Sequence, residues 1–285
     1  MFLQQLVTGI SVGGIYALLA TGYSLIYSLL DFSNWAHGEF AMVSAYIAIV
    51  LSSFMGMPFV LAAVGGMAGG ALVSFLCERF AYRRIRRNGA PNMFLMIAAM
   101  GLSNVFQQAA NLIFSGQYRS YPFKLPVSTI KVASAYIGVL DLVSLAITAV
   151  IITILVYLIN KTQFGLNVRA IACNAHAAKV LGVKVDRCIA TVFVLAGALA
   201  GVAGVLYGMK YNVFPTMGNV GLKAFIASVI GGLGSVPGAI VGAIILGVIE
   251  TFVSAFISSS LRDFFSFALL IVLLLVKPSG LFGVD

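Results

Sequence analysis

Charged residues are scarce in this chain. Only 9% of its 285 residues are Asp, Glu, Lys or Arg, whereas an ordinary soluble domain carries about 25%. Together with 61% hydrophobic residues and a mean hydropathy of +1.07, this scarcity excludes a soluble globular protein. We therefore expect one transmembrane domain over residues 1–285, with no room for a separate soluble domain.

Residues that perform catalysis or bind metals are also few. The three cysteines, at positions 77, 173 and 188, lack metal-type spacing and fall near ends expected in the cytoplasm, so reduced thiols are expected. His37 and Glu39 have no accompanying nucleophile or ligand cluster. The glycine-rich stretch 231–238 lacks the Gly-Lys-Ser/Thr ending of a nucleotide-binding loop. The sequence therefore predicts no catalytic residue, no metal and no cofactor.

Acidic residues are outnumbered by basic ones, which gives a net charge of +9. In a soluble protein this excess would suggest a nucleic-acid partner, which we do not expect here. In a membrane protein it indicates loops that face anionic membrane lipids and a partner protein. Residues 1–5 carry no basic group before the first apolar run, so the first span is expected to be retained rather than cleaved as a signal peptide.

Long apolar runs fill most of the chain. About 20 apolar residues are needed for a helix to cross a bilayer, and runs of this length or somewhat shorter recur throughout the chain. They predict an all-α polytopic bundle of about eight spans. They cover residues 6–29, 40–54, 58–77, 93–114, 137–159, 189–209, 239–257 and 264–276, with a short apolar piece at 224–230 and a polar loop at 117–134.

Two spans are interrupted, at residues 31–39 and 231–238. Backbone that leaves helical geometry at membrane depth must be buried in protein or line an aqueous cavity, and such breaks mark substrate paths in transporters. The predicted path residues are Asn34, Trp35, His37, Glu39, Gly231, Gly232 and Gly234. An alternative for the first break stays open: a turn at the interface, in which Asp31 or Ser33 caps the next helix, Trp35 anchors at headgroup level and His37 is solvated.

Basic clusters predict the orientation. If residues 79–87 are cytoplasmic, alternation also places 161–187 and Lys277 inside, so that this side holds eleven of the seventeen Lys and Arg residues and the N-terminus lies outside. Three Gly-x-x-x-Gly pairs, at 66–70, 204–208 and 238–242, predict helices packed closely on one another. Glu250 lies inside a predicted span and either lines the path or accepts a hydrogen bond from a neighbouring helix.

The loop at 160–187 cannot lie in hydrocarbon, where each Lys or Arg costs roughly 2.5–3.5 kcal/mol. Residues 170–181 favour one short surface helix that ends at Gly182. The spacing from His176-Ala177-Ala178 to Gly182 resembles the Glu-Ala-Ala-x-x-x-Gly loop of ABC importer permeases, with His176 in place of Glu. The resemblance implies an ATPase-coupling segment, whose candidate residues are Arg169, Asn174, His176, Ala177, Ala178, Lys179 and Gly182. An ordinary cytoplasmic loop with a helical turn is the alternative.

Several further motifs occur in a family's order over nearly the whole chain. They are Asn34-Trp-Ala-His-Gly-Glu-Phe, Arg169-Ala-Ile-Ala followed by Leu-Gly-Val, the stretch 196–204, Gly231-Gly-Leu-Gly-Ser-Val-Pro-Gly-Ala and the tail 277–283. Together they resemble the LivH family, the permeases of branched-chain amino-acid ABC importers. The chain departs from that pattern in Trp35, usually Phe, and in Asn174, where the coupling segment is often acidic.

The resemblance implies a fold similar to the vitamin B12 and ribose class of importer permeases, in a bacterial inner membrane. It also implies four partner subunits: a second homologous permease, two cytoplasmic ATPase subunits that bind ATP, and a periplasmic amino-acid-binding protein. Leucine, isoleucine and valine are the expected substrates. A permease for urea or short-chain amides, an ion-coupled secondary transporter and a structural membrane protein remain as alternatives.

Overall fold

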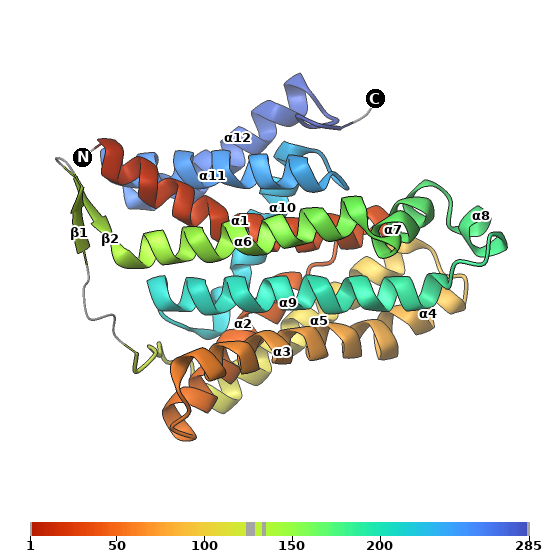
Figure 1. Ribbon diagram of the computed structural model, residues 1–285, viewed down its shortest axis with the longest axis horizontal. Helices are drawn as coiled ribbons and strands as arrows, with labels where there is room; N and C mark the ends of the chain where they lie inside the picture. Colours follow the sequence, from red (N-terminus) through yellow and green to blue (C-terminus); the bar gives the residue numbers. More distant parts are fainter. Residues whose placement is uncertain (1, 124–128, 133–134, 284–285) are drawn as a thin grey trace.

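The computed structural model describes residues 2–123, 129–132 and 135–283, and it is almost entirely helical (Figure 1). Within these residues, eight helices are long and apolar enough to cross a membrane, which confirms the predicted all-α polytopic bundle. They are α1 (Phe2–Leu30), α2 (His37–Ile49) with its π-helical extension η1 (Val50–Phe54), α3 (Phe59–Cys77) with its continuations, α5 (Asn92–Phe114), α6 (Val139–Lys161), α9 (Val185–Tyr211), α11 (Val236–Phe256) and α12 (Arg262–Val276), preceded by the 3-10 turn η4 (Ser259–Leu261).

The third span is longer than its apolar run predicts. It was expected to end near Cys77, but the helix continues through η2 (Glu78–Tyr82) and α4 (Arg83–Arg87) and stops only before Gly89, whose φ is +67°. The apolar run marks where hydrocarbon ends rather than where the helix ends, because no glycine or proline lies between these positions. The arginines of α4 therefore stand beyond the apolar part of the span, on a rigid helical extension.

Shorter helices and strands lie at the two ends of the bundle. The helices α7 (Gln163–Cys173) and α8 (Ala175–Val180) lie at the same end as α4, which we call the basic end (Figure 1). At the opposite end, β1 (Thr129–Val132) and β2 (Ala135–Gly138) pair antiparallel, with Thr129 opposite Gly138. We call this the hairpin end. The first strand lies in the predicted polar loop at 117–134, whereas β2 overlaps the start of the predicted span at 137–159, whose helix begins only at Val139.

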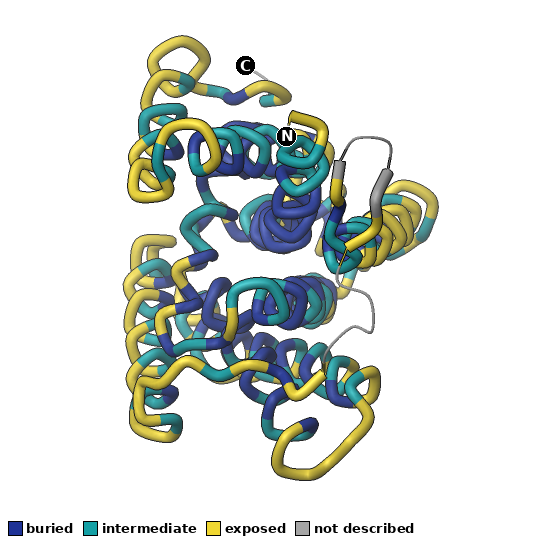
Figure 2. Tube along the Cα trace, turned by 90° about the vertical axis from the view of Figure 1, so that its left-hand side faces the viewer, coloured by how far each residue is buried: buried dark blue, intermediate teal, exposed yellow. Residues whose placement is uncertain are grey.

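Helices approach closely at glycines. A Cβ on Gly13 would lie 2.8 Å from the Cα of Ile244, so α1 and α11 touch backbone to backbone. A Cβ on Gly66 of α3 would lie 2.6 Å from the carbonyl oxygen of Ser44 in α2. Such contacts replace the hydrophobic effect, which does not draw helices together in lipid. Of the eight spans, α1, α2 and α9 are the most buried and α12 and α5 the least. Figure 2 shows the buried segments toward the middle of the bundle and exposed segments around them.

Two helices begin in the middle of the bundle rather than at an end. The imidazole of His37, the first residue of α2, contacts the carbonyl oxygen of Leu19 at 3.1 Å. Because Leu19 lies eleven residues before the end of α1, α2 begins about 16 Å from that end. The helix α10 (Val220–Gly231), with about 18 Å of length, is too short to cross a bilayer core of about 30 Å.

The amino-terminal ends of these two helices meet. A Cβ on Gly221 of α10 would lie 2.7 Å from the Cα of Gly38 in α2. From this contact α2 runs to the hairpin end, whereas α10 runs beside the second half of α1, where the Ser228 hydroxyl donates to the carbonyl of Ala20 at 3.0 Å. The short 3-10 helix η3 (Pro215–Asn219) leads into α10. The middle of the bundle thus contains two helix starts that point in opposite directions.

Close packing at one glycine can be tested directly. We expect Gly201→Leu to lower the melting temperature and the yield of the purified protein, because a Cβ there would lie 2.7 Å from the Cα of Met67 and the backbone cannot move aside. Gly101→Leu on α5 is the matched control, since no atom lies within 4 Å of its added Cβ. Equal melting temperatures for the two variants would contradict the packing described here.

Candidate functional site

The basic end carries two short helices where one was predicted. The single helix expected over residues 170–181 is wrong, because the chain bends at Asn174, which has an extended backbone with φ of −161°. The Asn174 side chain accepts a hydrogen bond from the amide of Ala177 at 2.9 Å and so caps the start of α8. Asparagine is among the best N-cap residues, and this signal in the sequence was overlooked. Gly182, with φ of +86°, ends the segment as predicted.

The candidate coupling residues divide into anchoring and exposed groups. The Arg169 guanidinium donates to the carbonyl of Ile159 at 2.7 Å and ties α7 to the end of α6. Ala178 is buried, while His176, Ala177, Lys179 and Gly182 are exposed. The large exposed apolar side chains of this turn were not among the predicted residues: Val180 and Leu181 are 77% and 82% exposed. Their apolar character beside basic neighbours was visible in the sequence.

One aspartate joins the two basic segments of the chain. Asp186, at the start of α9, accepts hydrogen bonds from Arg83, Arg86 and Arg87 at 2.8, 2.8 and 2.9 Å. The structure therefore places the two basic segments at one end, as their common orientation predicted. Glu78 also pairs with Arg86, at 3.3 Å, so two carboxylates face three guanidinium groups and the cluster keeps a positive charge. The same arginines line an open cavity of about 700 Å³ together with His176, Lys179, Lys184 and Arg187.

The first break lies inside the protein, between α1 and α2. Asn34, His37 and Glu39 are all buried, and the residue that caps α2 is Ala36, without a side-chain hydrogen bond. The alternative of a solvated interfacial turn capped by Asp31 or Ser33 is therefore wrong. Trp35 is 38% exposed and packs against Phe225 of α10, with ring centroids 5.8 Å apart.

Each buried polar side chain of this break has one hydrogen-bonded and one free group. The Asn34 side-chain oxygen accepts from the hydroxyl of Tyr82 at 2.9 Å, and the Glu39 Oε1 accepts from Ser103 at 3.1 Å. Because the Leu19 carbonyl only accepts, Nε2 of His37 carries the proton. Among the described residues, the Asn34 amide nitrogen, His37 Nδ1 and Glu39 Oε2 have no partner. A buried polar atom left unpaired costs about 1–3 kcal/mol, so these three atoms favour a partner that the described side chains do not supply.

The second break lies elsewhere, at the basic end. Gly234 is near Ser28, close to the end of α1, and Gly232 has φ of +105° and lies beside Gly283. The carbonyl of Gly231 accepts a hydrogen bond from the amide of Phe282 at 2.9 Å. The structure therefore does not bring the two groups of predicted path residues together. The whole length of α10 separates them, because only its amino-terminal end reaches the first break.

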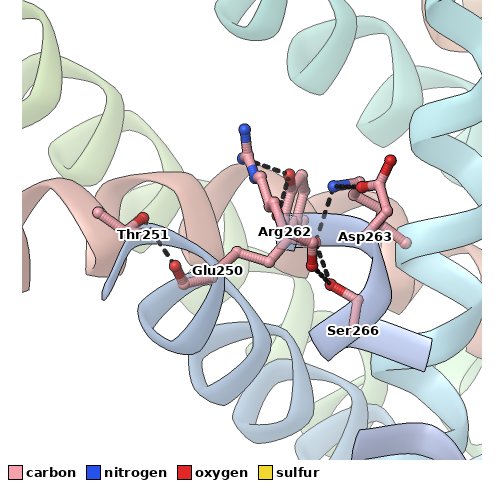
Figure 3. A network of polar contacts seen from close by, with 8 residues as sticks. Glu250, Thr251, Arg262, Asp263 and Ser266 are labelled. Carbon is pink, nitrogen blue, oxygen red and sulfur yellow. Dashed lines mark hydrogen bonds and ion pairs between the residues drawn. The ribbon is translucent and has the colours of Figure 1, made fainter. Parts of the chain in front are cut away.

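Glu250 is the centre of the largest polar network in the described part of the bundle (Figure 3). Its buried carboxylate accepts bonds at 2.9, 2.8, 2.8 and 2.6 Å, from Tyr16 of α1, Lys223 of α10, and Arg262 and Ser266 of α12. Of the two roles left open by the sequence, acceptance of hydrogen bonds from neighbouring helices is confirmed. Lys223 and Arg262 also line a cavity of about 580 Å³ between α10 and α12.

Comparison with known proteins shows similarity along nearly the whole chain. Residues 5–274 match a family model described as the permease component of branched-chain amino acid transport systems. A high-affinity branched-chain amino acid transport system permease protein of Pseudomonas aeruginosa, BraD, is 36% identical over 99% of this chain and 96% of its own length. LivH of Escherichia coli, with the same description, is 35% identical over the same shares. A fructose import permease protein of Bifidobacterium longum is 28% identical over 80% of this chain and 62% of its own length.

The charge network around Glu250 predicts a strong effect on stability. We expect Glu250→Gln to destabilise the protein by an amount approaching 3–5 kcal/mol, the cost of removing one partner of a buried ion pair, because Lys223 and Arg262 lose their shared counter-charge. Ser266→Ala, which removes a single hydrogen bond to the same carboxylate, should cost only about 1 kcal/mol. Thermal unfolding in detergent measures both, and a smaller effect for Glu250→Gln than for Ser266→Ala would refute the assignment.

Proposed function

The chain belongs to the family of permease components of branched-chain amino acid transport systems, and we propose that it forms one half of the membrane passage of an ABC importer for leucine, isoleucine and valine. The observation that carries this proposal is the similarity of 35–36% over 99% of the chain to permeases named for that transport. The fructose permease shares the architecture at lower identity and coverage, so the cargo is assigned from the nearer relatives. The passage is completed by a second, homologous permease in the bacterial inner membrane.

The basic end fits a cytoplasmic ATPase. Its two apolar side chains, Val180 and Leu181, project from α8 and its following turn, and the surrounding groups are basic. Burying such side chains in a pocket supplies most of the energy of a protein interface, while complementary charges fix its orientation. In this proposal ATP is bound by two partner subunits, and their closure displaces α7 and α8. A periplasmic binding protein delivers the amino acid at the hairpin end.

Two contacts are placed to transmit that displacement into the membrane. The Arg169 bond to Ile159 couples α7 to α6, and the Asp186 bonds couple the start of α9 to the arginines of α4. Since α9 packs on α2 and α3 at glycines, a tilt of α9 reaches the point where α2 and α10 begin. The unpaired atoms of Asn34, His37 and Glu39 lie at that point and gain partners when the helices separate.

The exposed pair predicts a specific loss of coupling. We expect the double variant Val180→Ser, Leu181→Ser to fold normally, because both side chains are in solvent, but to lose at least tenfold in amino-acid uptake and in co-purification with the ATPase subunits. Cys173→Ser, an exposed change on the preceding helix, is the control. Retention of both properties in the double variant would remove the proposed docking role.

The energy source separates the proposal from ion-coupled transport. In vesicles containing the complete importer, uptake of radiolabelled leucine should stop when ATP is depleted and continue when an uncoupler removes the proton gradient. The opposite pattern would identify a secondary transporter. Uptake of urea or acetamide in preference to leucine would preserve the ATP-driven mechanism but overturn the assigned substrate.

A further inference from the structure

The cavity between α10 and α12 combines charged and apolar surfaces. Its volume of about 580 Å³ lies within the range of about 300–1,000 Å³ that small-molecule sites occupy. Lys223, Arg262 and Asp263 contribute its charges, and Leu222, Ile226 and Phe267 are among its apolar walls. We propose that this cavity binds the zwitterionic backbone of an amino acid on its way into the passage, an inference that rests on the proposed function.

The cavity lies on the side from which an imported substrate arrives. Its polar residues stand at the start of α12, at the end of the bundle opposite α8 (Figure 1). Its lining includes Val220, at the start of α10, and Met217, in the preceding 3-10 helix η3. A molecule in the cavity therefore lies next to the place where α10 meets α2, in the middle of the bundle.

The fixed charges around the cavity sum to zero. Lys223 bridges two carboxylates, at 2.8 Å from Glu250 and 2.9 Å from Asp263, and Arg262 binds Glu250 through Nε at 2.8 Å. Two cations and two anions thus face one another. A ligand with net charge would unbalance this set, whereas a zwitterion adds one charge of each sign.

Both signs retain free hydrogen-bonding capacity. The Glu250 carboxylate is enclosed and already accepts four bonds, but the Asp263 side chain is 71% exposed and only its Oδ1 has a partner among the described residues. Of the N–H groups of Arg262, Nε donates to Glu250 and Nη2 donates to Tyr16, and Nη1 has no hydrogen-bond partner in the described part of the chain. Asp263 is placed to accept from a ligand ammonium group, and Arg262 is placed to donate to a ligand carboxylate.

The apolar walls complete the fit to an aliphatic amino acid. Leu222 of α10 and Phe267 of α12 are partly exposed and offer apolar surface to the cavity, while Ile226, also in its lining, is almost fully buried. Burial of a leucine or valine side chain against such walls is favourable, because it removes apolar surface from water. Urea lacks both the side chain and the separated charges, so it gains neither set of contacts.

A cysteine in the cavity wall makes binding measurable. Thr216 lines the cavity and is exposed, so Thr216→Cys, in a Cys173→Ser background, should react with a maleimide in phosphatidylcholine nanodiscs that hold the complete importer. We expect millimolar L-leucine to slow this labelling at least threefold. Leucinamide, which lacks the carboxylate, and 4-methylpentanoate, which lacks the ammonium group, should not.

The control variant addresses the charge that the ammonium group meets. Asp263→Asn should abolish the protection by leucine and leave the labelling rate without leucine unchanged, because Asp263 is exposed and Lys223 keeps Glu250 as its partner. The proposal would be overturned if leucinamide and 4-methylpentanoate protected Thr216→Cys as strongly as leucine does. It would also be overturned if leucine still gave full protection in Asp263→Asn.

A phospholipid headgroup has similar chemistry, since phosphatidylethanolamine is also a zwitterion. Stronger protection by glycerophosphoethanolamine than by leucine would identify a lipid site and overturn the amino-acid assignment. Measuring leucine uptake by the same importer distinguishes the proposed cavity site from the proposed function. Normal uptake without protection refutes only the cavity site, whereas absent leucine uptake, with uptake of another cargo, refutes the proposed function.

Discussion

Hydrocarbon offers no hydrogen bonds, and this constraint governs the whole bundle. Polar groups within the spans must find partners inside the protein, and helices must hold together without a hydrophobic driving force. The chain answers the first demand with a few shared carboxylates, of which Glu250 binds groups from three other helices. It answers the second with glycines that let backbones touch, as at Gly13 and Gly66. The first break gathers three of the buried polar atoms that have no partner among the described residues.

The strongest polar contacts and the weakest ones lie in different parts of the bundle. The networks around Glu250 and Asp186 lie near opposite ends of the bundle and hold its helices there. Between them, α2 and α10 merely abut, through Gly38 and Gly221, beside polar atoms without partners. Atoms without partners at such a contact favour a second conformation that supplies them, because opening the contact then loses less. In the mechanism proposed above, the ends of the bundle would hold while this middle contact changes.

Local patterns in the sequence predicted what depends on local chemistry. Apolar runs located the spans, basic clusters identified one end, and Gly182 ended its helix where a left-handed residue was expected. The cap by Asn174 was equally local but competed with strong helix formers on both sides, which hid it. The continuation of the third helix past Cys77 was not predicted, because hydropathy indicates which residues contact lipid and not which residues are helical. The partners of Glu250 lie as far as 234 positions away, so only tertiary structure reveals them.

The pairing of the tail with α10 has a consequence for biosynthesis. The amides of Leu281 and Phe282 bind the carbonyls of Ile230 and Gly231, so the last turn of α10 is completed by residues made long after it. A helix too short to cross the bilayer alone gains little from inserting early. The carbonyls at the end of α10 therefore gain these partners only after the tail has been synthesised.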